Sequence, residues 1–413
     1  MKKAILLVLI LAILTAAATP ALAEGIRTDG FTDRSEIRNQ NAVQMLVDLG
    51  LISGYEDGSF RPCNTITREE TAKLIAILCT DDPSELHTDA VFSDVPADYW
   101  SAQYINYCTA RRIIAGDGNG RFRPKDCVTA QELAKMLLVT LGEDAQRYIG
   151  ADWAENVNAD AQLCGIYAGF SASCAAPITR DNACLLIFNA MQCPQVVAPE
   201  QEGFMRYALD ELMNPLAYME IRFELKRYTA TLTGNECADL TSSDGRLEKG
   251  MTKLAGHKEF AVSTDLSLLG RSVDIYVRDG RILGIPCYAA SEIYYTFSSV
   301  EELQKVCSTT SSVLNEQTAY YLDFGSTDPG ILEALPEDCF ITIIDHTGDF
   351  CFDIVLVTSF AEAEVTSVSP LRIRLGQEET DCGKFRTDDV FAVGQTVWCL
   401  DVRGAHYIRP IVE

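Results

Sequence analysis

The feature that most constrains this chain is an internal repeat in its first half. Residues 31–79 read FTDRSEIRNQNAVQMLVDLGLISGYEDGSFRPCNTITREETAKLIAILC, and residues 92–141 follow the same frame. The frame is F-x-D, an apolar stretch, a Gly-rich loop, F-R-P, and Thr-x-x-Glu before a second apolar stretch. A weaker third copy covers residues 148–193. One unit of this length cannot bury its apolar faces alone, so three units are predicted to pack together.

Each unit is predicted to form two helices joined by a tight loop. In unit one, apolar residues recur at helical spacing before Gly50, which is a typical helix stop. The loop that follows carries Gly54, Asp57 and Gly58, and both of its glycines are expected to adopt positive φ.

The second helix of each unit is predicted to begin after an N-cap threonine. A glutamate three residues further on completes a capping box in units one and two, and an asparagine takes that place in unit three. The caps and their partners are Thr67 with Glu70, Thr129 with Glu132, and Thr179 with Asn182.

The combination of F-x-D, G-Y-x-D-G-x-F-R-P and I-T-R-x-E resembles the S-layer homology (SLH) domain of bacterial cell-surface proteins. The resemblance covers residues 27–80, 88–142 and, in degenerate form, 148–193. It implies an all-α, pseudo-threefold module that binds secondary cell-wall polysaccharide, often pyruvylated, in grooves between the units. It also implies a carbohydrate-binding role at the cell wall, in the S-layer.

Two arginines are the main candidates for contact with such a polymer. Arg68 and Arg180 each follow an N-cap threonine, where unpaired first-turn N–H groups and a guanidinium could hold a carboxylate together. The alternative is a surface ion pair between Arg68 and Glu69 or Glu70. The full set of candidate binding residues is Arg68, Arg180, Thr67, Thr179, Gly54, Asp57, Gly58, Trp100, Asp117 and Trp153.

Three departures from the family pattern affect this prediction. Ala130 stands in the arginine place of unit two, and Ile37 stands in the tryptophan place of unit one. In unit three the glycine loop shrinks to 169–170. We therefore expect at most two complete grooves, a smaller contribution from Arg180 beside the short loop of unit three, and a gain in binding from Ala130→Arg. Trp100 and Trp153 either stack on a sugar or pack between units.

The N-terminal segment predicts where the protein is located, and the net charge limits the kinds of partner it can bind. Lys2 and Lys3, an apolar run from 5 to 14 and the Ala21-Leu22-Ala23 pattern predict a secretory signal peptide over 1–23, with an uncleaved anchor as the alternative. The chain has 59 Asp and Glu against 34 Lys and Arg, a formal charge of -25. That balance argues against nucleic acid or anionic lipid as a partner, and an anionic polymer would need local positive sites.

The second half is predicted to be rich in β-strands, so the whole chain is an α+β multidomain protein. Residues 194–201 are a predicted linker, 202–290 a β-rich module with a leading helix, and 291–413 a second β-rich region of small barrels or sandwiches. Asp279-Gly280 predicts a hairpin turn, and Ser299 caps a predicted short helix. Phrases such as TGNECADL resemble the region after the SLH repeats of clostridial surface proteins, which indicates context but no chemistry.

No catalytic residue, metal site or cofactor is predicted. The four histidines, His87, His257, His346 and His406, form no H-E-x-x-H motif, and neither a G-x-S-x-G elbow nor a phosphate-binding loop occurs. The second half is therefore expected to be a structural or interaction region rather than an enzyme. The alternative is an SLH-anchored extracellular hydrolase acting on polysaccharide, because paired carboxylates suffice for that chemistry.

Two further patterns have ordinary interpretations. Asp345, Asp349 and Asp353 lack the alternate spacing and late glutamate of a calcium loop, so a hairpin turn at Gly348 is favoured. The fifteen cysteines contain no C-x-x-C pair. Most of them are expected to be small buried side chains, and a few could pair.

Overall fold

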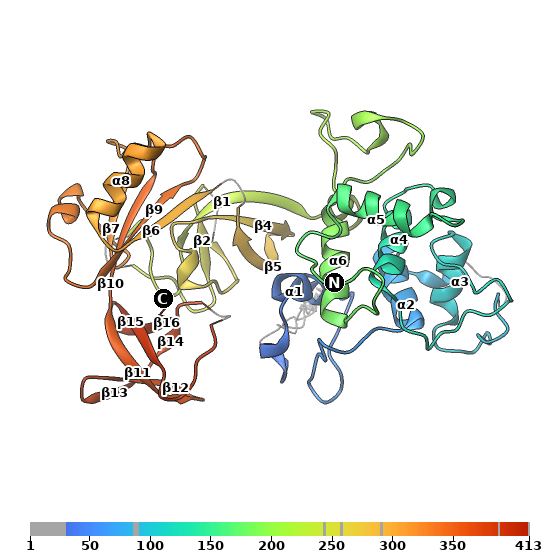
Figure 1. Ribbon diagram of the computed structural model, residues 1–413, viewed down its shortest axis with the longest axis horizontal. Helices are drawn as coiled ribbons and strands as arrows, with labels where there is room; N and C mark the ends of the chain where they lie inside the picture. The colour runs from blue at the N-terminus through green and yellow to red at the C-terminus, as the bar shows by residue number, and fades with distance from the viewer. Residues whose placement is uncertain are drawn as a thin grey trace, which may run out of the picture.

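The computed structural model describes residues 30–85, 91–242, 245–256, 259–289, 292–386 and 389–411. The expected signal segment, His87 and His257 lie outside these ranges. The molecule has a helical lobe and a β lobe, with β1, β4 and β5 between them (Figure 1). Within the described ranges, no helix combines the length and the apolar character that a membrane crossing requires.

The helical lobe contains three helix pairs, one for each predicted unit. The pairs are α1 (Gln40–Asp48) with α2 (Arg68–Cys79), α3 (Ala102–Ala110) with α4 (Ala130–Thr140), and α5 (Trp153–Cys164) with α6 (Arg180–Gln192). The predicted capping boxes at Thr67 and Thr129 are both present, and Thr179 accepts a hydrogen bond from the Asn182 amide.

A closed ring of backbone hydrogen bonds relates the three units. Ile66 N donates to Ile178 O at 3.2 Å, Ile178 N to Val128 O at 2.8 Å, and Val128 N to Ile66 O at 3.1 Å. These three side chains are buried in the helical core. Because each unit gives one bond and receives one, the segment 148–193 occupies a position equivalent to the other two despite its weaker sequence match.

The F-x-D motif has a structural role in holding the F-R-P segment. Asp33 accepts hydrogen bonds from the amides of Phe60 and Arg61 at 2.8 and 2.7 Å. The Phe31 and Phe60 rings also pack together, with centroids 5.2 Å apart. Asp94 repeats the same two bonds in unit two.

Glycine is required at positions 54 and 58 of the loop for two different physical reasons. Gly58 adopts a φ of 79°, as expected. Gly54 does not adopt positive φ, so that prediction was wrong. A Cβ on Gly54 would lie 2.5 Å from Cε1 of Phe31, which shows that the residue is small because the ring packs against it. Gly116 is equivalent, with Phe92 at 2.4 Å.

The β lobe consists of three open sheets, and none of them closes into a barrel among the described residues. Sheet one contains, in spatial order, β3 (Glu259–Phe260), β2 (Thr252–Leu254), β1 (Lys226–Gly234), β4 (Ser272–Arg278) and β5 (Arg281–Tyr288). Sheet two contains β6 (Ile293–Phe297), β9 (Cys339–Asp345), β10 (Ile354–Ser359), β7 (Ala319–Leu322) and β8 (Gly325–Thr327). Sheet three contains β13 (Glu378–Asp381), β12 (Leu371–Leu375), β11 (Ala361–Val368), β15 (Thr396–Val402), β16 (Ala405–Pro410) and β14 (Gly383–Lys384).

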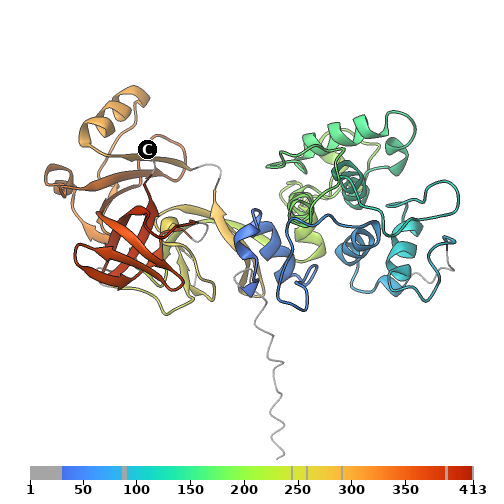
Figure 2. The same cartoon turned by 60° about the horizontal axis from the view of Figure 1, so that its bottom comes forward.

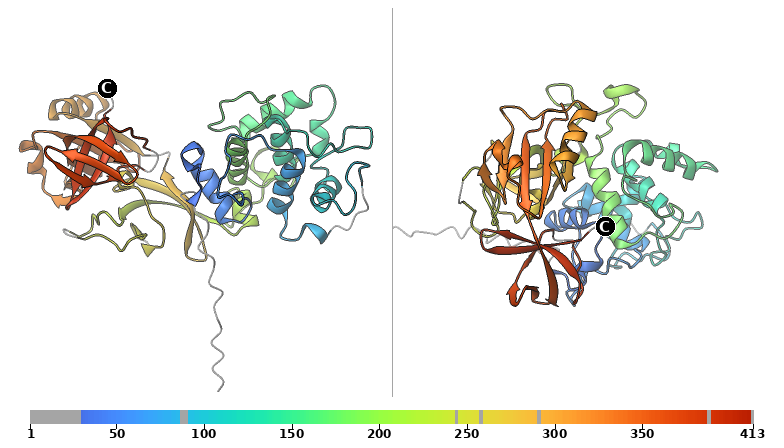
Figure 3. Two further views of the ribbon diagram at one scale, coloured as in Figure 1. Left: turned by 90° about the horizontal axis from the view of Figure 1, so that it is seen from below. Right: turned by 60° about the vertical axis from the view of Figure 1, so that its left-hand side comes forward.

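The three sheets pack into one lobe. Sheets one and two share a core that includes Leu232, Ile275 and Ile344. The predicted helix α8 (Val300–Thr310) covers the other face of sheet two, with Leu303 buried against it. Sheet three has its own small core and lies beside sheet two (Figure 3). These layers account for the alternating apolar strands of the second half.

The turns of the β lobe form as predicted. Asp279 and Gly280 both have positive φ, the geometry of a two-residue hairpin turn. Asp345 is fully buried and accepts hydrogen bonds from the amides of Gly348 and Phe350 at 2.7 and 2.8 Å. Its carboxylate therefore shapes a turn, and no group of His, Cys, Asp or Glu among the described residues could hold a metal ion.

The helical and β lobes are in direct contact. Helix α1 lies against β5 (Figure 2), where Gly284 N donates to the Asp48 carboxylate at 2.8 Å and Ile285 N to the Asn41 side chain at 2.9 Å. Tyr276 of β4 is buried in the helical core and donates to Gln192 at 2.7 Å. The two lobes therefore share packed residues.

The segment between the lobes differs from the prediction in two ways: residues 194–201 pack against the helical lobe rather than forming a free linker, and residues 202–226 are less helical than expected. Val196 is buried and its amide donates to Leu141 O at 2.8 Å. Residues 202–226 form only the short turn η5 (Gly203–Arg206) and the five-residue helix α7 (Tyr218–Arg222). Tyr218, Met219, Phe223 and Leu225 pack into the helical core, whereas Leu212 and Met213 are exposed, so this stretch does not form the predicted continuous helix.

Candidate functional site

Arg68 crosses from unit one to the loop of unit two. Its Nε donates to Phe122 O at 2.9 Å and its Nη2 donates to Ala115 O at 2.8 Å. The guanidinium also stacks 4.5 Å from the centroid of the Phe122 ring. The alternative of an ion pair with the neighbouring glutamates is not what forms, because Glu69 pairs with Lys125 and Glu70 caps the helix.

Arg180 makes the equivalent crossing from unit three to the loop of unit one. Its Nη2 donates to Ser53 O at 2.5 Å, and the guanidinium lies 4.7 Å from the Phe60 ring and 5.1 Å from the Tyr55 ring. The expectation that Arg180 lies beside the short loop of unit three is therefore wrong. Its partner is the complete loop of unit one.

The first-turn N–H groups of these helices are not free, which corrects a second expectation. Arg68 N donates to Asp126 O at 2.9 Å and Glu69 N to Pro124 O at 3.1 Å. The same two bonds recur at α4 and at α6. An anion at this position would therefore meet the guanidinium rather than the backbone of the helix.

A cavity of about 370 Å³ opens beside Arg68, and all three units contribute to it. We call it the Arg68 groove. Unit one supplies Arg68, unit two supplies the loop and one face of α4, and unit three supplies the start of α5. Its polar and aromatic lining includes Arg68, Asp117, Arg123, Glu132, Lys135, Tyr148 and Trp153.

The Arg68 groove carries a net positive formal charge, since three cations face two carboxylates. Burial lowers the pKa of Lys135 and of Arg68. The Lys135 ammonium lies 5.9 Å from the centre of the Trp153 ring. A cation, a guanidinium and an indole face together suit an acidic sugar, because the ring offers a stacking surface and the cations offer hydrogen bonds to a carboxylate.

Threefold equivalence assigns the other two grooves. The amide bonds from Glu69, Gln131 and Asp181 to Pro124, Cys174 and Pro62 align the three loops residue by residue. By this equivalence, Lys73 and Trp100 take the places of Lys135 and Trp153 in the groove where Arg180 meets the loop of unit one, which we call the Arg180 groove. The Ala130 groove contains Ala130, Ala172 in place of the phenylalanine, Ser173 in place of the loop arginine, Leu185 and Ile37.

The three departures from the family pattern, which lie in three different units, therefore all fall in the Ala130 groove. Gly169 of the short loop lies 3.9 Å, measured from an added Cβ, from the Leu185 side chain. Asn39, two residues after Ile37, donates to Asp181 at the start of the same helix, α6. The Ala130 groove has lost its cations, its aromatic platform and its tryptophan together, whereas the other two grooves retain all of them.

Comparisons with known proteins agree with this architecture. The S-layer homology domain family matches residues 30–72 and 91–134. The "Surface-layer 125 kDa protein" of Lysinibacillus sphaericus is 30% identical over 185 residues, and the "Cellulosome-anchoring protein" of Acetivibrio thermocellus is 33% identical over 85 residues. The chain is an SLH-domain-containing cell-surface protein.

The relatives share only part of their length with this SLH protein. The matches cover 41% of this chain and 15% of the surface-layer protein, and 20% of this chain and 19% of the anchoring protein. The "Exoglucanase XynX" of Acetivibrio thermocellus is 28% identical over 179 residues, which is 39% of this chain and 16% of that enzyme. The chain therefore spans less than a fifth of the length of these relatives.

The remaining predicted site residues have mixed roles in the SLH module. Thr67 and Thr179 cap helices, and Gly54 gives room for a ring. Asp57 accepts from Ser59 and forms an ion pair with Arg61 at 2.9 Å, and these contacts lower its pKa. Gly58 only shapes the loop. These residues build the loop on which the arginine of the neighbouring unit stacks.

Asp117, Trp153 and Trp100 are placed at or near the grooves. Asp117 and Trp153 both line the Arg68 groove. Amides of Asn119 and Arg121 donate to Asp117 and lower its pKa. Trp100, two residues before α3, is 46% exposed, and its ring centroid lies 6.4 Å from that of Tyr104.

Arg123 and Lys135 were not among the predicted site residues, although both line the Arg68 groove. Arg123 was visible in the F-R-P motif. Lys135 could have been found from its spacing, because it lies on the same side of α4 as Glu132, one turn further along. Its neighbour across the groove, Trp153, comes from another unit and gives no local signal.

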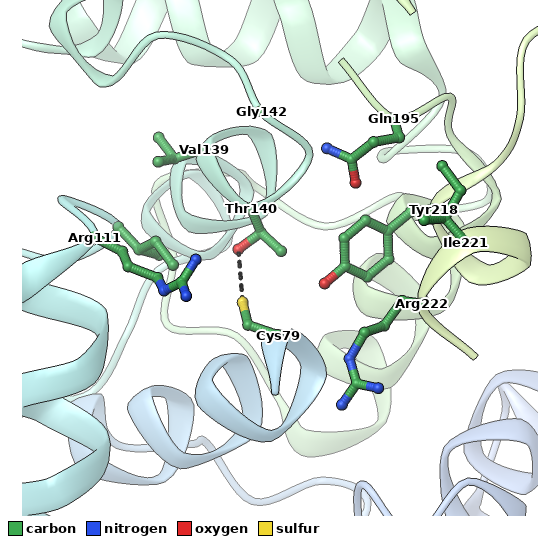
Figure 4. Close-up of a pocket in the computed structure, with 10 residues that line it drawn as sticks. Cys79, Arg111, Val139, Thr140, Gly142, Gln195, Tyr218, Ile221 and Arg222 are labelled. Carbon is green, nitrogen blue, oxygen red and sulfur yellow. Dashed lines mark hydrogen bonds between the residues drawn. The ribbon is translucent and has the colours of Figure 1, made fainter. Parts of the chain in front are cut away.

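A second cavity, of about 500 Å³, lies at the opposite ends of the helices. Figure 4 shows Arg111 on one side of Cys79 and Thr140, with Tyr218 and Arg222 on the other. Tyr218 and Arg222 both donate to Leu78 O, at 3.0 and 3.1 Å, and so satisfy a carbonyl at the end of α2. This arrangement closes the base of the helical lobe.

Proposed function

We propose that the SLH module holds the chain on an acidic secondary cell-wall polysaccharide through two of its three grooves. The segment 148–193 acts as a degenerate third SLH repeat. The β lobe projects from the wall as a sandwich-like structural or interaction region. A cleaved signal peptide over 1–23 accounts for export.

The carrying observation is the composition of the Arg68 groove. In a chain with a formal charge of -25, three cations line this cavity, and one of them, Lys135, lies beside the Trp153 ring. An acidic polymer is repelled by the whole molecule and attracted only where such positive sites are concentrated. A pyruvylated sugar has the two features that the groove recognises, an acid group and a flat sugar face.

The Arg180 groove is the second binding site. Arg180 stacks on Phe60 as Arg68 stacks on Phe122, and both arginines donate to equivalent loop carbonyls. Two sites on one module bind a repeating polymer more tightly than either site alone, because the second contact is intramolecular.

For the β lobe we propose a structural or interaction role without hydrolase activity. The carboxylate of Asp345, in the turn with Asp349 and Asp353, accepts hydrogen bonds from the backbone amides of Gly348 and Phe350 and so has a structural role. The similarity to exoglucanase covers 179 residues, fewer than half of this chain. Hydrolysis of wall glycans by the full chain, abolished by one carboxylate substitution, would overturn this proposal.

The anchoring proposal is tested with the full chain and purified wall sacculi. Sacculi that retain their secondary polymer should bind the chain, and acid-extracted sacculi should not. The double variant Arg68→Gln, Arg180→Gln should lose binding, because glutamine keeps some hydrogen bonding but no charge. Arg374→Gln, an exposed arginine of β12 in the β lobe, is the control and should bind as the parent does. Equal binding to both wall preparations refutes the mechanism.

A further inference from the structure

Two cysteines of unit three lie against each other at the far ends of their helices. Cys164 is the last residue of α5, and Cys193 directly follows α6. The Cys193 Sγ lies 2.9 Å from the Cys164 carbonyl oxygen and 3.3 Å from the Asn189 carbonyl oxygen, and the Cys164 Sγ lies 3.7 Å from the Ala161 carbonyl oxygen. They are 29 residues apart in the chain, so this contact is a product of the fold.

The backbone around both cysteines is held by other contacts. The Asn189 side chain of α6 donates to Ile166 O at 3.0 Å and to Ala168 O at 2.8 Å, which fixes the turn after Cys164 to α6. The carbonyl of Cys193 accepts from Tyr218 N at 2.9 Å. The Cys193 side chain is therefore held against the backbone of Cys164 without a covalent bond between the two residues.

The two thiols differ in the way that an attacking and a resolving cysteine differ. Cys164 is half-buried and reachable from solvent, whereas Cys193 is 4% exposed. The interaction between the two side chains lowers the pKa of Cys164 and raises that of Cys193. Cys164 is thus the better nucleophile toward a reagent in solution.

We propose that Cys164 and Cys193 are a disulfide-forming pair that closes by exchange with a low-molecular-weight disulfide. The Cys164 thiolate attacks one sulfur of the reagent, which releases one thiol and leaves a mixed disulfide on Cys164. The Cys193 thiol loses its proton and attacks the Cys164 sulfur, which releases the second thiol. The protein loses two hydrogens and is oxidised, and one reagent disulfide is reduced to two thiols.

The bond would tie together the two helices that deliver groove residues. Helix α5 begins at Trp153 of the Arg68 groove, and α6 begins at Arg180 of the Arg180 groove. Linking their far ends restrains both helices without touching either groove.

The test treats the folded full chain with oxidised glutathione, blocks free thiols with N-ethylmaleimide, and analyses a tryptic digest by mass spectrometry. Trypsin places Cys164 with Cys174 in peptide 148–180, and Cys193 with Cys184 in peptide 181–206. A cross-link between these peptides is therefore assigned with serine variants. The double variant Cys174→Ser, Cys184→Ser is the matched control.

The expected result is a cross-link that persists in this control and is lost in Cys164→Ser and in Cys193→Ser. Cys193→Ser should instead accumulate glutathione on Cys164, because the resolving thiol is missing. The proposal is overturned if the control forms no cross-link between the two peptides, or if the cross-link survives in Cys164→Ser. The control retains both proposed partners, so the test stands even where a single variant folds poorly.

Discussion

Ala130→Arg separates what the sequence pattern implies from what the structure implies. The pattern predicts that the substitution restores a missing arginine and strengthens polymer binding. In the structure, Ala130 is fully buried and its amide donates to Ala176 O at 3.3 Å. The loop that an arginine would reach belongs to unit three, where Ala172 replaces the phenylalanine on which Arg68 and Arg180 stack.

The two expectations differ in sign and in size. A restored charge-assisted hydrogen bond is worth about 1.5–3 kcal/mol, or roughly a tenfold to hundredfold gain in affinity. Because Ala172 replaces the phenylalanine ring, the new guanidinium would have no ring to stack on, and this gain in affinity is not expected. Forcing a long side chain into a packed position instead costs about 1–3 kcal/mol of folding stability, with a further loss if the charge stays buried. We therefore expect no gain in affinity and a lower melting temperature.

Binding of the full chain to sacculi across a range of concentrations, together with thermal unfolding, decides between them. Ala130→Arg with Ala172→Phe is the informative companion, because it supplies the stacking ring as well. A tenfold tighter binding by the single variant at unchanged melting temperature would refute the groove assignment. Equal weakening by Arg68→Ala and Arg180→Ala, each about tenfold to hundredfold, follows from the same assignment.

Three other outcomes are expected. Gly116→Ala should cost about 1–3 kcal/mol in unfolding experiments, because its Cβ would lie 2.4 Å from Phe92, whereas Gly30→Ala, with nothing within 4 Å, should stay within about 0.5 kcal/mol of the parent. Binding to the acidic polymer should weaken as the pH rises toward the pKa of an ordinary lysine, because the pKa of Lys135 is lowered and its positive charge is lost at a lower pH. In a series of sacculus assays at increasing pH, Lys135→Arg should remove this decline, because arginine stays charged. A fragment of residues 30–193 should melt below a fragment of residues 30–289, since it lacks Tyr276 and Leu283 of the helical core; equal melting temperatures would show that the lobes are independent.

Much of the fold follows from local sequence patterns. The helix caps, the hairpin turn at Asp279 and the helix after Ser299 depend on residues within a few positions of each other, and all three form as predicted. The role of Gly54 could not be predicted from its neighbours in sequence, because it depends on the ring of Phe31, more than twenty residues away. Positive φ and close packing both select glycine, and the sequence does not distinguish them.

The arrangement of the grooves could not be predicted from single units. Each groove combines the arginine position of one unit, the loop and the lysine position of the next, and the tryptophan position of the third. When the units are compared one at a time, Ala130, Ile37 and the short loop are each assigned to a different binding groove. The same comparison assigns Arg180 to the loop of its own unit, whereas its partner is the loop of unit one. Only the hydrogen bonds between units reveal that the three losses coincide.

The ring through Ile66, Val128 and Ile178 also explains why a unit whose own loop has lost its binding residues is still present. Removing unit three would break two of the three ring bonds and expose the buried side chains of both neighbours. The same removal would take Arg180 away from the loop of unit one. The loop of one unit can therefore lose its ligand contacts without harm to the other two grooves, but the unit itself cannot be deleted, because the number of units is set by closure of the ring rather than by binding.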